Sequence, residues 1–98
     1  MHALNEAWAV RAAPEAELPL ELLEDLQTVC LGDSLESRLG LRPGEGPASL
    51  ERAAAEGASR WRAFVNGGRA TAAQARVGDV ACRSYEALWE QVASNGAR

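Results

Sequence analysis

The sequence predicts an all-α fold: a small helical bundle of three main helices plus a short N-terminal helix, with the last two helices forming an antiparallel hairpin. Apolar residues recur at spacings of three and four along three long stretches, and helix start and stop signals bound those stretches. The 98 residues are 47% hydrophobic but only 5% aromatic, so Leu, Val and Ala must build most of the core. We therefore expect one helical domain over residues 1–98, because a chain this short holds a single core.

The short N-terminal helix is expected over residues 3–13 and should stop at Pro14, because proline lacks the N–H that a helix interior requires. Its residues at helical spacing are Leu4, Ala7, Trp8 and Arg11. This spacing predicts that these four side chains share one face.

The second helix is expected over residues 19–31, with Pro19 in its first turn and Gly32 ending it. Its predicted core face is Leu22, Leu23, Leu26, Val29 and Cys30, and its predicted solvent face is Glu21, Glu24, Asp25 and Thr28. A short helical turn should follow at 34–39. The expected capping box of Asp33 and Glu36 would start that turn, and Gly40 would close it.

Residues 40–47 form the one clear linker, since they hold three Gly and two Pro in eight positions. We expect a hinge there. Beyond it, a helix over 48–66 should present one apolar side with small residues in its middle and large ones at its end. Those residues are Leu50, Ala53, Ala54, Gly57, Ala58, Trp61, Phe64 and Val65.

The last helix is expected over residues 71–94, and a Thr71–Gln74 capping box marks its start. Its predicted apolar face is Val77, Val80, Ala81, Tyr85, Leu88 and Val92. Because only four residues separate this helix from the one before, the two should pair as an antiparallel hairpin. Trp61, Phe64, Tyr85 and Leu88 should share the core of that hairpin.

Catalytic and metal-binding groups are scarce in the sequence. The only histidine is His2, so nucleophilic catalysis that relies on a Ser-His or Cys-His pair lacks its base. Glu21, Glu24 and Asp25 lack the glycine and ligand spacing of a calcium loop and are interpreted as a solvated helix face. No glycine-rich phosphate-binding pattern follows a strand. We therefore expect no enzymatic activity, no cofactor and no metal.

The two cysteines, Cys30 and Cys82, lie far apart in apolar helical patterns and are expected to be buried free thiols. No apolar run approaches the ~20 residues that span a bilayer, and the N-terminus lacks the pattern of a signal peptide. The expected location is the cytoplasm.

Every basic residue is Arg and none is Lys, which indicates genomic codon bias. The segment from Arg-Trp-Arg-Ala-Phe at 60–64 through Arg-Ser-Tyr-Glu-Ala-Leu-Trp at 83–89 resembles helical segments of all-Arg, Ala-rich bacterial proteins, among them the stalk regions of dynamin-like GTPases. The chain has no GTPase motif, so the resemblance implies only a helical structure and no residue role.

The charge is unevenly distributed along the chain. The net charge is −4, with −6 over residues 1–47 and +2 over residues 48–98. An acidic total disfavours a dedicated nucleic-acid binder, because phosphate contacts need a basic face. The two halves can attract each other, or each can attract a partner of opposite charge.

One group of exposed residues suggests a docking surface on the last helix and its entry. Arg69, Arg76 and Arg83 recur every seven residues and predict a nearly straight stripe on one side of the helix, with Trp89 at the edge of the core. Arg and Trp are common anchors at protein interfaces. The alternative is a solvated stripe whose guanidinium groups pair locally with Asp79 and Glu86.

These observations predict a non-enzymatic helical module that binds a protein, either another copy of itself or a larger assembly, through Arg69, Arg76, Arg83 and Trp89. The alternative is a small regulator that uses the Arg-bearing C-terminal half to bind nucleic acid. Nucleic-acid binding at low salt would distinguish the two.

Overall fold

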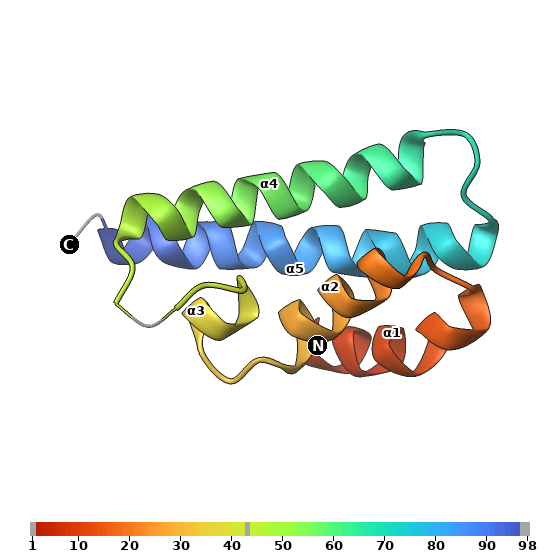
Figure 1. The fold of residues 1–98 in the computed structure, drawn as a ribbon, viewed down its shortest axis with the longest axis horizontal. Helices are drawn as coiled ribbons and strands as arrows, with labels where there is room; N and C mark the ends of the chain where they lie inside the picture. Colours follow the sequence, from red (N-terminus) through yellow and green to blue (C-terminus); the bar gives the residue numbers. More distant parts are fainter. Residues whose placement is uncertain (1, 43, 97–98) are drawn as a thin grey trace.

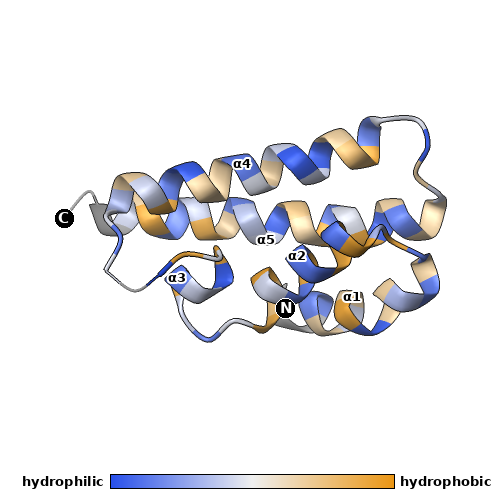
Figure 2. Ribbon diagram, in the orientation of Figure 1, coloured by the Kyte–Doolittle hydropathy of each residue, from blue (hydrophilic) through white to orange (hydrophobic). Residues whose placement is uncertain are grey.

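The computed structural model describes residues 2–42 and 44–96, and side chains over 5–42 and 44–94. The described part is all-α and contains no strand, as predicted (Figure 1). Its helices are α1 (His2–Ala16), α2 (Leu20–Leu31), α3 (Leu35–Arg38), α4 (Pro47–Asn66) and α5 (Ala72–Gly96). Hydrophilic and hydrophobic residues alternate along these helices, as expected for helices with one buried side (Figure 2).

The antiparallel hairpin of α4 and α5 is confirmed, and it makes the most extensive contact between helices (Figure 1). The predicted capping box starts α5. The Gln74 N–H donates to Thr71 Oγ1 at 3.1 Å, and the Thr71 N–H donates to Gln74 Oε1 at 2.9 Å. The side-chain amide of Gln74 also donates to the Glu17 carbonyl, which ties the turn between α1 and α2 to the start of α5.

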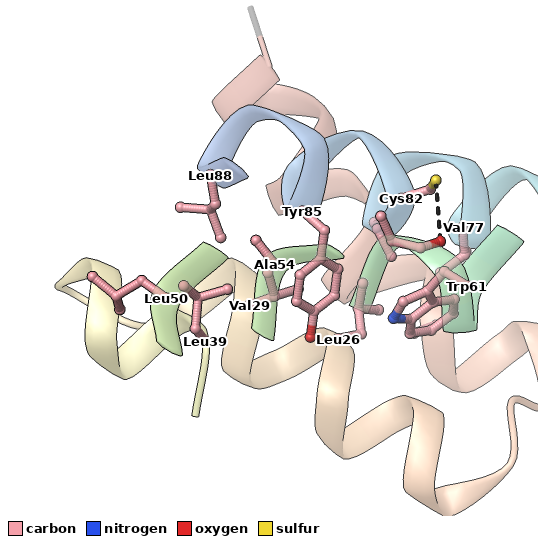
Figure 3. Packing of buried hydrophobic residues seen from close by; sticks show 14 of the residues in the cluster. Leu26, Val29, Leu39, Leu50, Ala54, Trp61, Val77, Cys82, Tyr85 and Leu88 are labelled. Carbon is pink, nitrogen blue, oxygen red and sulfur yellow. Dashed lines mark hydrogen bonds between the residues drawn. The ribbon is translucent and has the colours of Figure 1, made fainter. Parts of the chain in front are cut away.

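Glycines let α4 and α5 approach closely. A Cβ at Gly57 would lie 2.2 Å from the Tyr85 ring, and one at Gly78 would lie 2.5 Å from Val65 Cγ2. Trp61 fills the space between the helices with no exposed surface, and its ring meets the Phe64 ring edge to face. Tyr85 and Leu88 are also buried, whereas Phe64 is half-buried. Trp61, Tyr85 and Leu88 are thus in the core of the hairpin, as predicted (Figure 3). Phe64, the fourth predicted residue, is partly buried and packs against that core.

The structure confirms the predicted core face of α2, but the residue that caps α3 differs from the predicted one. Leu26 and Val29 are fully buried and the other three predicted residues pack against the core. However, Ser34 rather than Asp33 caps α3. Its Oγ accepts the Ser37 N–H at 3.0 Å, and its extended backbone suits the N-cap position.

The prediction for α1 was wrong in length. The helix contains Pro14 and continues to Ala16, because the lost hydrogen bond falls in its last turn, and Glu17 then leaves the helix with φ +58°. The predicted face is mainly solvent-exposed; the side chain of Leu4 lies outside the described residues. The buried positions belong to Ala9, Ala13 and Ala16, together with Glu6. Alanines allow the α1 backbone to lie close to α5. The contact between α1 and α5 is more extensive than the contact between α2 and α5.

The predicted linker over 40–47 is non-helical until Pro47, where α4 begins, and Pro43 lies outside the described residues. Gly40 and Gly44 both have positive φ, at 73° and 92°, which glycine adopts without strain. The Leu41 N–H donates to the Glu36 carbonyl at 2.8 Å, so the start of the linker is held against α3.

Across residues 2–42 and 44–96, none of the helices combines the length and the apolar character needed to cross a membrane.

Candidate functional site

The helix α5 has two sides that differ in how they are covered. Tyr85 and Arg76 are nine residues apart, so at about 100° per residue they point in opposite directions. The side of Tyr85 faces α2, because the Tyr85 hydroxyl hydrogen-bonds to an α2 side chain. We call this the closed side. The side of Arg76, between α1 and the end of α4, is the open side.

On the closed side, Asp25 of α2 joins three helices. Its Oδ2 accepts from Trp61 Nε1 at 2.6 Å and from the Tyr85 hydroxyl at 2.8 Å, and its Oδ1 accepts from Arg60 at 2.9 Å. The prediction that Asp25 faces water was therefore wrong. Trp61 and Tyr85 both extend from the hairpin toward α2 near Leu26 (Figure 3). This carboxylate provides acceptors for two aromatic donors that would otherwise be buried without partners.

A second polar cluster joins α1, α2, α3 and α5. The carboxylate of Glu6 on α1 accepts from Arg38 of α3 and, at 2.6 Å, from the fully buried Ser84 hydroxyl of α5. The Arg38 Nε also donates to the Val29 carbonyl at the end of α2. Gly32 permits this approach, since a Cβ there would lie 2.8 Å from the Arg38 backbone nitrogen. The cluster therefore joins the short helix α3 to α1, α2 and α5.

Both cysteines are free thiols, as predicted; Cys82 is buried and Cys30 is partly buried. Burial raises the pKa of Cys30 to about 11, and the nearby Glu6 carboxylate adds to the effect. Burial and the Glu86 carboxylate also raise the pKa of Cys82. Burial and the bond to Asp25 raise the pKa of Tyr85. These groups therefore stay protonated at neutral pH and are poor nucleophiles.

The open side carries a groove of about 500 Å³ between α1, the end of α4 and α5. Trp8, Val65, Ala75 and Val80 form its apolar surface, and Asn5, Arg76, Asp79 and Arg83 form its polar surface. A second hollow of about 320 Å³ shares Trp8 and Arg76 with it and continues along α1 to Glu15 and Ala16. Trp8 is 40% exposed, so a large apolar ring lies between the two hollows with access to solvent.

The charges in this groove are only partly neutralised within the chain. Arg83 pairs with Asp79 at 3.5 Å, and both side chains are mostly exposed. Glu86 pairs with Arg62 of α4 rather than with Arg83. Within residues 5–42 and 44–94, Arg76 forms no ion pair. Local pairing therefore accounts for Arg83 but not for Arg76.

The four predicted partner-binding residues do not all lie together. Arg76 and Arg83 line the groove, whereas Arg69 is exposed in the turn before α5. Trp89 is 45% exposed. It lies seven residues, or about two turns, after Cys82, which contacts the Ala58 carbonyl of α4. Trp89 is therefore on the side of α5 that faces α4. Relative to Arg83 it is rotated by about 120°.

Sequence reasoning missed two apolar contributors to this groove, Trp8 and Val65. The helical spacing placed Trp8 on one face with Leu4, Ala7 and Arg11 but did not show whether that face packs or is exposed. The alanines at positions 9, 13 and 16 carried the better signal, since their spacing of four and three marks the side of α1 that packs.

No protein-family model matches this chain, and comparisons with curated proteins and with solved structures found no match either. The part of the chain that the structure describes holds no cluster of three His, Cys, Asp or Glu side chains that could bind a metal ion. The site must therefore be interpreted from its own geometry.

Proposed function

We propose that this protein is a non-enzymatic helical interaction module that binds a protein segment in the groove on the open side of α5. The observation that carries this proposal is the exposed Trp8 ring in a groove that also contains Arg76, a cation with no carboxylate partner in the described part of the chain. A large rigid ring and a planar guanidinium are the side chains that anchor most protein interfaces.

The shape of the groove favours a helical or extended segment over a small molecule. It is open to solvent and continues from α5 into a second hollow along α1. Amphipathic helices bind in such grooves by placing apolar residues in the hollows and polar residues at the rim. The two Arg side chains at the rim favour a partner that carries carboxylates.

The remaining chemistry of the chain supports a binding role. The described thiols and Tyr85 have raised pKa values and are held within the fold. Free thiols also support our proposal that the protein acts in the cytoplasm, where cysteines stay reduced.

The two partly exposed tryptophans provide a matched test. We expect Trp8→Ala to abolish co-purification of the partner, because it removes the apolar ring at the middle of the groove. We expect Trp89→Ala to leave it intact, since Trp89 lies on the α4 flank. Loss of the partner with Trp89→Ala and its retention with Trp8→Ala would instead place the docking surface on that flank.

A further inference from the structure

We propose that the occupant of the groove is α2 of a second copy of this chain, which docks through its solvent-facing residues. This inference rests on the proposed function, because it names the partner of the same groove. The docking residues, which we call the outer stripe, are Leu20, Glu24, Gln27 and Leu31.

The outer stripe is a straight, uncovered row on α2. At about 100° per residue its four members lie within about 60° of one another around the helix. They are all exposed, whereas Leu26 and Val29 on the opposite side are fully buried. Leu20 is 68% exposed and Leu31 is 65% exposed, more than any other large hydrophobic side chain in the described residues. Two exposed leucines therefore lie at the two ends of one row, with Glu24 and Gln27 between them.

The lengths of the two surfaces agree. The two hollows border α5 from Ala73 to Arg83, ten residues or about 15 Å of helix. Leu20 and Leu31 are eleven residues apart, or about 16 Å. An α2 helix laid along the groove can therefore place one leucine at each end, on either side of Trp8.

The charges of the two surfaces are complementary. Glu24 lies on the outer stripe between the leucines, and its carboxylate makes no ion pair within the described residues. Arg76 lies between the two hollows and is likewise without an ion pair there. The same complementarity holds over the whole chain, which carries −6 before residue 48 and +2 after it. The groove is lined by both halves and also holds Asp79, which pairs with Arg83, and Glu15 at its far end, so the specific match is the one between Glu24 and Arg76.

The arrangement also determines the kind of assembly. The outer stripe faces away from the closed side of α5, whereas the groove is on the open side. Each copy therefore uses two different surfaces, so the contact is head to tail and produces a ring or a filament instead of a reciprocal dimer.

Sedimentation velocity of the full chain from micromolar to millimolar concentration tests this inference. We expect the average mass of the wild-type protein to rise beyond twice the monomer mass of 10.4 kDa, and to fall again at high salt. Arg76→Glu and Glu24→Arg should each weaken association at least about tenfold, because each places like charges together. The double variant, in which the two charges are exchanged, should recover association. Arg52→Glu, on the exposed side of α4, is the control and should associate like the wild type.

A wild-type protein that stays at the monomer mass throughout overturns the inference, as does a double variant that stays monomeric while the wild type associates. Neither result overturns the proposed function, which fails if Trp8→Ala leaves partner binding unchanged. A monomeric protein that loses a different partner on Trp8→Ala shows that the groove binds a foreign segment.

Discussion

The closed and open sides of α5 use the same kinds of residues in different ways. On the closed side, Asp25 accepts hydrogen bonds from donors on two other helices, and aromatic rings are buried. On the open side, Trp8 is exposed, and Arg76 forms no ion pair with a carboxylate of the described residues. Polar and aromatic groups that find partners inside the chain stabilise the fold, whereas those without partners are accessible to another molecule. The comparison predicts that changes on the closed side affect stability and changes on the open side affect binding.

The largest effect on stability is expected from Leu88→Ala in the core. Leu88 is 2% exposed and packs in the hairpin (Figure 3), so its truncation should lower the free energy of unfolding by ~2 to 5 kcal/mol. Urea unfolding measures this change. Trp8→Ala removes more atoms from the open side and should shift the midpoint much less. Equal shifts for the two variants would contradict the division into two sides.

A smaller loss is expected from Asp25→Ala, which leaves Trp61 Nε1 and the Tyr85 hydroxyl without their acceptor. An unsatisfied buried donor costs about 1 to 3 kcal/mol. Glu24→Ala, one residue earlier on the exposed face of α2, is the control and should change stability by no more than about 0.5 kcal/mol. If both substitutions had the same small effect, Asp25 would not hold α2 against the hairpin.

Stability should also fall at alkaline pH because of groups on the closed side. Cys30 has an ordinary pKa of 9.0 that rises to about 11 in the folded chain. Above pH 9 the unfolded chain loses this proton while the folded chain keeps it, so ionisation favours unfolding until the pH passes the folded value. The raised pKa of Tyr85 acts in the same direction at higher pH. Thermal unfolding from pH 8 to 11 should show a falling midpoint, with a shallower fall in Cys30→Ala; an identical fall in that variant would exclude Cys30 as a cause.

The helices and the hairpin could be predicted because their signals are local. The Thr71–Gln74 box and the glycines after Asn66 lie within a few residues of the boundaries they set. The buried side of α4 could also be predicted, because its buried residues are more apolar than its exposed ones. These features need no knowledge of the tertiary structure.

The polar clusters and the groove could not be predicted in this way. Asp25 resembles any exposed carboxylate on an amphipathic helix, and its aromatic partners lie 36 and 60 residues further along the chain. Glu6 and Ser84 are 78 residues apart. The Arg stripe was visible in the sequence, but the ring that completes the groove comes from α1, whose packed face consists of three alanines and Glu6.

Reversing the charges on the open side should have the smallest effect on stability. It is also the most direct test of the central claim, that the open side of α5 is the docking surface. Arg83 and Asp79 are 68% and 63% exposed, so Arg76→Glu/Arg83→Glu should change the free energy of unfolding by only a few tenths of a kcal/mol and leave the helical spectrum intact. The same variant should lose the protein partner that co-purifies with the wild type, whether that partner is a second copy or a foreign chain. Arg42→Glu/Arg52→Glu carries the same change in charge elsewhere and should keep it. Retention of the partner by the groove variant, with the fold intact, would contradict the claim that the open side of α5 is the docking surface.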